Sequence, residues 1–264
     1  MKIYKPAGRA REYSPLSLNY LSHCDLGCLY CFSKRLTDMQ NMKNKGFKPI
    51  QVIKPTASDW ARIEKSAKKM QGCNEQILLS FLHDSYCDAE VGETRRLLKI
   101  LNQYGHKVSI LTKNPENALR DLDIMKAFGE RFKIGTTLTF DNDADSLQYE
   151  PGAPLPQSRI DALKEFERNG ITTWSSFEPV IMPSQSLNLL NQVVGFIDHV
   201  KVGKINHFGN YSQQINWAQF LADAVQILRN GDMDDRFYIK KDLLDFNQGV
   251  YLSANETDMD WLNL

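Results

Sequence analysis

LSLNYLSHCDLGCLYCF, residues 16–32, is the stretch that decides the fold. Its first seven residues alternate in polarity and are rich in strand-forming side chains, which predicts a β-strand over residues 16–22. Its remaining residues bring three cysteines, Cys24, Cys28 and Cys31, into eight consecutive positions. The stretch therefore predicts a strand that delivers three thiols to the loop at its carboxyl end.

A rhythm of short apolar runs and amphipathic stretches continues from there to the end of the chain. Mostly apolar runs, typical of strands buried on both faces, cover residues 76–82, 106–112, 133–140, 172–181 and 196–203. Helical patterns cover residues 58–70, 90–105, 115–129, 156–170, 186–195 and 216–231. The first of these helices is expected to begin at a cap residue, Ser58 or Asp59, and the third at Pro115.

A strand followed by a helix, repeated about six times, predicts a parallel sheet with crossover helices. We expect a partial (β/α)6 barrel of the TIM type, with parallel strands inside and helices outside. The chain is interpreted as one domain over residues 1–264, with the barrel at about 14–210 and a C-terminal helical extension at about 211–264. In such folds the reactive residues lie at the carboxyl ends of the strands, where the cysteine loop is expected.

The composition is that of a globular, intracellular protein. Of the 264 residues, 42% are hydrophobic and 24% charged, and no window approaches eighteen uninterrupted apolar residues. The first residues are basic without an apolar run, so they do not predict a secretory signal. The odd number of cysteines does not fit a disulfide framework. We therefore expect a cytoplasmic, reduced protein with no membrane partner.

The formal net charge is zero, but the charges are unevenly distributed. Residues 1–70 carry 14 Lys or Arg against 5 Asp or Glu, and the remainder carries 18 against 27. Much of the basic excess lies within residues 34–69. Two interpretations stay open: a solvated helix face with its loop, or a basic lip beside an active site that receives an anionic polymer.

Three clustered thiols point to a metal centre, and thiolate ligands suit zinc or an iron–sulfur cluster. A structural zinc ion needs a fourth ligand, which would have to be His23 or a distant residue such as Cys73, Cys87 or His83. A cubane cluster held by three cysteines keeps one iron open for a substrate or cofactor. We favour the cluster, and the zinc-binding interaction module stays as the non-enzymatic alternative.

The pattern Cys24-x3-Cys28-x2-Cys31, with Tyr30 before the last cysteine, resembles the signature of the radical S-adenosylmethionine (radical SAM) superfamily. The resemblance implies one 4Fe-4S cluster on these three cysteines, whose open iron chelates S-adenosylmethionine. It further implies that one electron, from a donor of the flavodoxin or ferredoxin type, cleaves the cofactor reductively. The 5′-deoxyadenosyl radical so formed abstracts a hydrogen atom from the substrate.

Further segments resemble the spore photoproduct lyase-like subgroup, the DNA repair photolyase type. They are HDSY at 83–86, residues 93–98, residues 108–114 and EPGAPLPQSRIDALKEFERNGITT at 150–173. This resemblance implies an enzyme that modifies or repairs a nucleobase or nucleotide, with DNA, RNA or a nucleotide as its substrate. The alternative within the superfamily is the same radical chemistry on a small molecule or a peptide.

Three residues at strand ends are candidate ligands of the cofactor. The resemblance implies that Lys113 contacts the cofactor carboxylate and that Asp84 takes its amine. Thr137 is favoured as a hydroxyl near the cofactor. Each has an alternative: Lys113 as a surface lysine at a helix start, Asp84 as a helix cap, and Thr137 as a threonine placed by ordinary β-propensity.

Glu178 and Gly203 end later strands. A carboxylate inside a parallel run is costly unless it is paired, so Glu178 is a candidate to bind the ribose hydroxyls or a substrate amine. Its alternative is an ion pair with Lys201 or Lys204. Gly203 is expected to let the backbone approach the adenine.

The aromatic rings of Tyr30 and Phe32 flank Cys31 and are expected to shield the cluster and pack on the adenine. Their alternative is a place in the core.

Cys87 is a candidate hydrogen donor. Spore photoproduct lyase uses a cysteine on the second strand of its barrel, where this chain has Ser80 and Phe81 and places Cys87 in the loop beyond. That difference argues against repair of the spore thymine dimer, and an ordinary half-buried thiol is the alternative role. With Cys73 and Cys87 alone remaining, no auxiliary cluster is expected.

Overall fold

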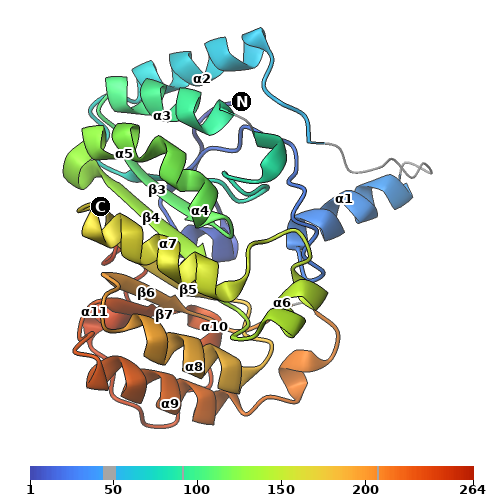
Figure 1. Cartoon of the computed structure of the whole chain (residues 1–264), viewed down its shortest axis with the longest axis vertical. Helices are drawn as coiled ribbons and strands as arrows, with labels where there is room; N and C mark the ends of the chain where they lie inside the picture. Colours follow the sequence, from blue (N-terminus) through green and yellow to red (C-terminus); the bar gives the residue numbers. More distant parts are fainter. Residues whose placement is uncertain (44–51, 91, 207) are drawn as a thin grey trace.

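The computed structural model describes residues 1–43, 52–90, 92–206 and 208–264. One curled sheet of parallel strands runs through them, and the strands follow each other in space in the order of the sequence (Figure 1). The strands are β1 (Leu16–Ser17), β2 (Gln76–Leu79), β3 (Lys107–Thr112), β4 (Phe132–Thr137), β5 (Thr172–Phe177), β6 (His199–Val202) and β7 (Phe237–Ile239). This is the expected partial barrel of the α/β class.

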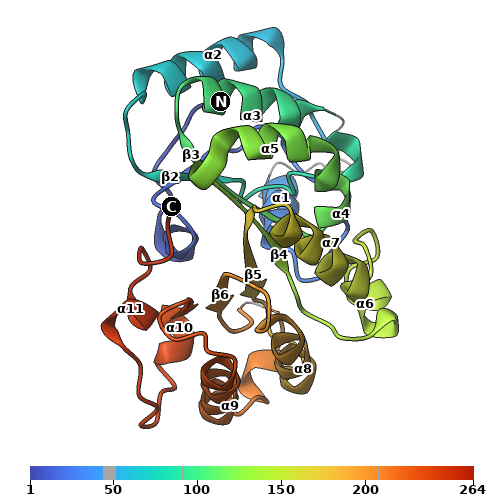
Figure 2. The same cartoon turned by 60° about the vertical axis from the view of Figure 1, so that its left-hand side comes forward.

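Helices cover the outer face of the sheet, whereas α1 projects away from it (Figures 1 and 2). The helices are α1 (Phe32–Lys43), α2 (Ala57–Lys69), α3 (Glu93–Gln103), α4 (Pro115–Ala118), α5 (Leu122–Phe128), α6 (Asp143–Tyr149), α7 (Pro156–Arg168), α8 (Pro183–Val193), α9 (Trp217–Asn230), α10 (Lys241–Leu244) and α11 (Ala254–Thr257). Short 3₁₀ turns are η1 (Gly8–Glu12), η2 (Asp88–Glu90), η3 (Leu119–Asp121), η4 (Gly129–Arg131) and η5 (Tyr211–Gln213). No helix in the described ranges has the length and apolarity needed to cross a lipid bilayer.

The sequence predicts six strands, and the described residues form a sheet of seven. The segment 211–264 is not a helical extension alone, because β7 within it pairs in parallel with β6 through Val200 and Phe237. All three residues of β7 are buried. A three-residue strand that follows a run of charged residues carries too little apolar pattern to be seen in the sequence.

The first strand is also shorter than the seven residues expected. Leu18, Tyr20 and Leu21 are buried, as their apolar pattern required, but they lie beyond the two paired residues of β1. The backbone N–H groups of Tyr20 and Leu21 turn toward the ring of His83 instead, at 3.2 and 3.1 Å from its Nε2 atom. The chain therefore leaves the sheet early and enters the cysteine loop.

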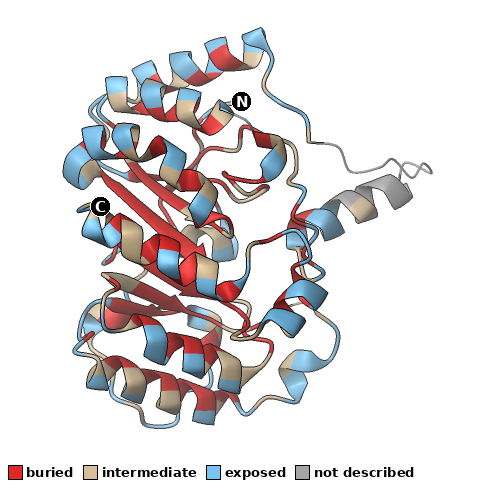
Figure 3. Ribbon diagram, viewed as in Figure 1, coloured by how far each residue is buried: buried red, intermediate tan, exposed pale blue. Residues whose placement is uncertain are grey.

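The apolar core lies between the sheet and the helices, and the strands are buried along their length (Figure 3). Leu97, Leu98 and Leu101 of α3, together with Ile63 of α2, are fully enclosed. Full burial of a side chain of this size contributes about 1.5–3 kcal/mol. These helices therefore hold the strands, and with them the strand ends, in a fixed arrangement.

Helix starts follow local chemistry, with one correction. α2 begins after Thr56, which forms a reciprocal capping box with Asp59. The expected caps, Ser58 and Asp59, lie within the first turn of the helix. α4 and α7 each begin with a proline, Pro115 and Pro156, as their sequences indicated.

Polar side chains inside the half-barrel attach to both ends of the chain. Lys133 donates to the carbonyl oxygen of Leu262, and Lys201 donates to that of Glu12 at 2.7 Å. Burial lowers the pKa of Lys133 to about 7 and lowers that of Lys201 as well. The N-terminal segment is thereby held inside the open barrel, which places Tyr13 at the strand ends.

Candidate functional site

A cavity of about 610 Å³ opens at the carboxyl ends of the strands. Most of the residues singled out in the sequence line it: Cys24, Cys28, Tyr30, Cys31, Phe32, Asp84, Lys113, Thr137 and Glu178. Cys87 and Gly203 are not among its lining residues. Because parallel strands end at one edge, positions more than 150 residues apart in the sequence meet around one space.

The three clustered cysteines share one wall of this cavity. The loop that carries them turns at Gly27, whose φ of +66° favours glycine, and closes with a hydrogen bond of 3.2 Å from the N–H of Cys31 to the carbonyl of Cys28. Burial raises the pKa of Cys24 to about 11 and that of Cys28 to about 12. These are thiols that a bound metal centre would convert to thiolates.

The donor set fits a cluster better than a single ion. No three His, Cys, Asp or Glu side chains in the described part of the chain converge closely enough to hold one metal ion. A tetrahedral zinc site requires that convergence, because each Zn–S bond is only about 2.3 Å long. Cysteines that hold different iron atoms of a cubane stand further apart. Three thiols facing one cavity therefore suit a 4Fe-4S group with one iron open.

His83 fixes the entrance to the cysteine loop. Its Nε2 atom accepts the two N–H groups described above, and its Nδ1 atom lies 3.2 Å from the carbonyl of Asp84. Accepting at Nε2 requires the neutral ring with its proton on Nδ1. Burial favours the same form, since it lowers the pKa of His83 to about 4. The ring is a fixed anchor rather than a zinc ligand.

Asp84 links the loop after β2 to the end of β3. Its carboxylate accepts from the Thr112 hydroxyl at 2.5 Å, from the Lys113 N–H at 2.7 Å and from the Tyr86 N–H at 2.8 Å. Burial raises its pKa, and the Thr112 hydrogen bond opposes that shift. The Asp84 carboxylate also lines the cavity. Its expected contact with a cofactor amine, through the remaining lone pairs, stays a prediction.

A buried carboxylate, Glu150, connects the cysteine loop to Lys113. It accepts hydrogen bonds from the Tyr30 hydroxyl and from Arg159, and the ammonium of Lys113 lies 4.0 Å away. Burial alone would raise the pKa of Glu150, but Arg159 and Lys113 together lower it. Arg159 also donates to the carbonyl of Thr137 at 3.1 Å.

Glu150 and Arg159 were given no role in the sequence, although both lie in the segment 150–173. Each side chain is only 1% exposed. Charged side chains are rarely buried to this extent without a partner, and the sequence does not reveal which of them are buried.

Glu178 is paired, but not with either lysine expected. Its Oε2 atom accepts from the Tyr13 hydroxyl at 2.6 Å and from the ammonium of Lys240, at the end of β7. Lys201 bonds to backbone carbonyls instead. Burial would lower the pKa of Lys240, but Tyr13 and Glu178 raise it overall. Tyr13 and Lys240 are thus site residues that the sequence did not indicate.

Gly203 makes room for this ion pair. A Cβ atom there would lie 2.9 Å from Cδ of Lys240 and 3.1 Å from Cδ of Glu178. The space beside its Cα atom is therefore filled by protein, and the expected approach to adenine stays a prediction.

Cys87 is not among the residues that line the cavity. It is fully buried in the core beside the cysteine loop. Burial raises its pKa, which keeps the thiol protonated, and its expected role as a hydrogen donor stays a prediction.

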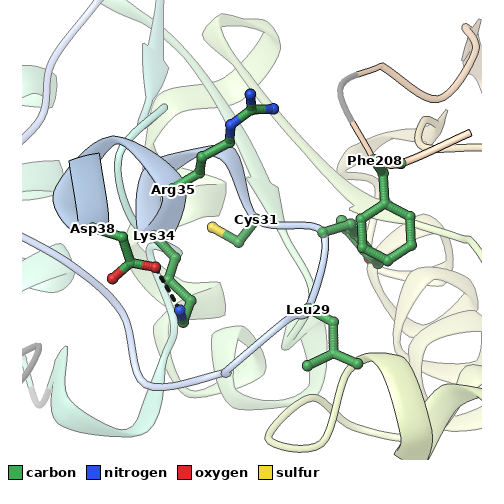
Figure 4. Close-up of a pocket in the computed structure, with 8 residues that line it drawn as sticks. Leu29, Cys31, Lys34, Arg35, Asp38 and Phe208 are labelled. Atoms are coloured by element: carbon green, nitrogen blue, oxygen red, sulfur yellow. Dashed lines mark hydrogen bonds and ion pairs between the residues drawn. The ribbon is translucent and has the colours of Figure 1, made fainter. Parts of the chain in front are cut away.

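A second cavity, of about 490 Å³, lies against the same loop and shares Tyr30, Cys31 and Arg35 with the first. Figure 4 shows Cys31 between helix α1, which carries Lys34, Arg35 and Asp38, and Phe208 on the opposite side. Lys34 is paired with Asp38 at 2.7 Å. The two cavities therefore meet at the cysteine loop.

The basic segment 34–69 is divided between two ends of the molecule. Lys34 and Arg35 border the cavities, whereas Lys68 and Lys69 occupy the last turn of α2. A helix that precedes a parallel strand runs opposite to it, so this turn lies at the far end from the mouth. Lys43 to Lys48 lie outside the residues whose side chains are described. The prediction of a basic lip beside the site is therefore wrong for the part of the segment that lies at the end of α2.

Comparisons with known proteins agree with the fold. No family model matches the chain. An uncharacterized protein of Methanocaldococcus jannaschii is 30% identical over 168 residues, which are 62% of this chain and 60% of that protein. The chain thus spans less than two thirds of this curated relative.

Solved structures that resemble the chain include those of two proteins. Streptococcus suis SuiB bound to S-adenosylmethionine has a TM-score of 0.61 and 16% identity, over 90% of this chain and 53% of SuiB. A variant of spore photoproduct lyase with bound AdoMet and dinucleoside spore photoproduct has a TM-score of 0.58 and 10% identity, over 86% of this chain and 76% of the lyase. At these identities the likeness establishes a shared fold.

Proposed function

We propose that the chain is a radical SAM enzyme of the spore photoproduct lyase-like kind, which modifies or repairs a nucleobase or nucleotide. The observation that carries the proposal is the position of Cys24, Cys28 and Cys31. They lie on the loop after the first strand and face the cavity at the strand ends of a partial barrel. Both kinds of solved neighbour have been captured with S-adenosylmethionine or AdoMet.

In this proposal the three thiolates hold a 4Fe-4S cluster. When bound, the group supplies the electron that cleaves S-adenosylmethionine and releases a 5′-deoxyadenosyl radical. The chain contributes placement: Lys113 offers a positive charge for the cofactor carboxylate, and Tyr30 covers the cavity beside Cys31. Glu150 holds both side chains in position through the contacts described above.

The rest of the cavity contributes polarity and exclusion of water. Thr137 and Asp84 bring polar groups to the ends of β4 and the loop after β2. Buried aromatic and aliphatic side chains behind them separate a reactive radical from solvent. An electron donor of the flavodoxin or ferredoxin type would act from outside the cysteine loop.

A peptide substrate is the second candidate, because SuiB has also been solved bound to precursor peptide SuiA. That structure covers 90% of this chain with a TM-score of 0.60. The two candidates differ in substrate and share the cluster.

The test is reconstitution of the full chain with iron and sulfide under anaerobic conditions. We expect about four iron atoms per chain, and a change in the electron paramagnetic resonance spectrum of the reduced cluster on addition of S-adenosylmethionine. Replacing Cys24, Cys28 or Cys31 by Ala should abolish both, whereas Cys73→Ala should retain them. Stoichiometric zinc without iron would overturn the proposal.

A further inference from the structure

The second cavity reaches one of the three clustered thiols without the side chains expected to hold the cofactor. Of Cys24, Cys28 and Cys31, only Cys31 lines it, and its side chain is half-buried. Asp84 and Lys113 line the first cavity and not the second. A molecule seated in the second cavity therefore contacts Cys31 and leaves the expected cofactor position open.

Apolar and aromatic side chains form one part of the lining. Leu29 is 55% exposed, although its backbone is fixed by a hydrogen bond of 2.9 Å from its N–H to the carbonyl of Tyr149. The Phe208 ring lies edge-on to Tyr30 at 6.4 Å and stacks at 5.2 Å on Tyr211, which is 40% exposed. Apolar side chains that gather at the rim of a cavity, rather than singly over the surface, mark a contact site.

Charged side chains of helix α1 form the other part of the lining. Figure 4 shows Lys34 and Asp38 across Cys31 from Phe208. Lys34 and Asp38 are 2.7 Å apart, but their side chains are 52% and 33% exposed, so the pair stays hydrated. With Arg35, the lining holds two positive charges against one negative charge. The helix begins directly after Cys31, so its positive dipole end adds to that excess.

We propose that this surface, the docking face of Leu29, Lys34, Arg35, Phe208 and Tyr211, binds a one-electron carrier protein of the flavodoxin type. The inference rests on the proposed function and names the contact through which its electron arrives. A carrier of this type is a small acidic protein with one edge of a flavin ring at its surface. Its carboxylates complement the positive charge of α1, and the apolar flavin edge suits Leu29 and Phe208.

The position of Cys31 gives the docking face its function. Electron transfer slows steeply with distance, and a redox group in the second cavity is separated from the thiolate-bound group by the Cys31 side chain. The carrier loses one electron and the group held by the three thiolates gains it, so the step is balanced. Contacts between electron-transfer partners are small and transient, so a few side chains around one cavity suffice.

The experiment measures binding of oxidised flavodoxin to the anaerobically reconstituted full chain by calorimetric titration. A ferredoxin with 4Fe-4S clusters is the second probe, and both proteins are titrated at low and at high ionic strength. We expect flavodoxin to bind, and to bind more weakly at high ionic strength because salt screens the charges. Ferredoxin should bind more weakly than flavodoxin.

Leu29→Glu should raise the dissociation constant for flavodoxin about tenfold or more, because a charge would be desolvated in the contact. Lys34→Glu should raise it about threefold or more, and only at low ionic strength. Both side chains are more than half exposed, so each variant is expected to fold and either one tests the face. Leu29→Met and Lys34→Arg should retain binding. Lys69→Glu is the matched control, because Lys69 is exposed in the last turn of α2 and lines neither cavity.

Formation of 5′-deoxyadenosine separates the two proposals. With dithionite, a small reductant that needs no docking face, the wild type, Leu29→Glu and Lys34→Glu should form it equally. With reduced flavodoxin, the two variants should form it more slowly. If flavodoxin binding requires Leu29 but no cluster forms, the enzyme proposal fails alone.

The docking face fails and the enzyme stands if dithionite supports the reaction but flavodoxin does not bind, or binds the wild type and Leu29→Glu equally. An equal loss in Lys69→Glu would also overturn the docking face. Tighter binding of ferredoxin with the same dependence on Leu29 would overturn the choice of flavodoxin. Displacement of flavodoxin by single-stranded oligothymidylate would assign the second cavity to the substrate instead.

Discussion

Glu150→Gln should strongly destabilise the protein, because Glu150 and Arg159 form a buried ion pair. Both side chains are 1% exposed, and loss of the carboxylate leaves the Arg159 charge enclosed without a counter-ion. Breaking a buried pair by removing one partner costs about 3–5 kcal/mol. Glutamine keeps one acceptor oxygen, so we take the lower figure, about 3 kcal/mol. At roughly 2–4 °C per kcal/mol for a chain of this size, the unfolding temperature should fall by about 6–12 °C.

The assay is thermal unfolding followed by circular dichroism, with Glu165→Gln as the control. Glu165 faces Arg168 at 3.5 Å, but these side chains are 46% and 68% exposed, and such surface pairs contribute little. The pKa of Glu150 is lowered in the folded state, so its contribution is present above the ordinary glutamate range and is lost as pH falls through the folded value. A drop no larger than that of Glu165→Gln at pH 7 would refute the reasoning.

Two further predictions concern the edges of the site. Burial lowers the pKa of His83 to about 4, so the stability of the wild type should fall as pH drops from about 6.5 to about 4. His83→Gln cannot titrate, and its unfolding temperature should fall less steeply over this pH range. Equal slopes for the two proteins would count against the buried neutral ring. Gly203→Ala should lower the free energy of unfolding by about 1–3 kcal/mol, because the added Cβ atom would press on Lys240 and Glu178. Gly195→Ala is the control, since a Cβ atom there meets nothing within 4 Å. Equal melting temperatures of the two variants would contradict this packing.

The parts of the fold set by local pattern were predictable. The apolar runs that became β2 to β6 can be read from the sequence, because strands buried on both faces must be apolar. The cysteine loop could then be placed at the strand ends, since it follows the first run. β7 could not be found, because three residues carry no period and their place depends on pairing with β6.

The site was predictable where residues lie at the ends of recognisable strands, as Asp84, Lys113, Thr137 and Glu178 do. Tyr13 was missed because it reaches the site from an irregular segment, and its partner Glu178 is 165 residues away.

Lys240 was missed because it ends the strand that the pattern did not reveal. For Glu150 and Arg159 the missing information was burial. A charged residue in a helix or beside one is ordinarily solvated, and only the tertiary structure encloses this pair.

The central claim is that the loop of residues 23–32 supports radical chemistry on S-adenosylmethionine. The most direct measurement is the formation of 5′-deoxyadenosine by the reconstituted full chain with S-adenosylmethionine and dithionite, followed by chromatography. The wild type and Cys73→Ala should form it, and Cys28→Ala should form none. Absence of 5′-deoxyadenosine from a wild-type protein that carries its full iron content, or equal amounts from Cys28→Ala, would contradict the account.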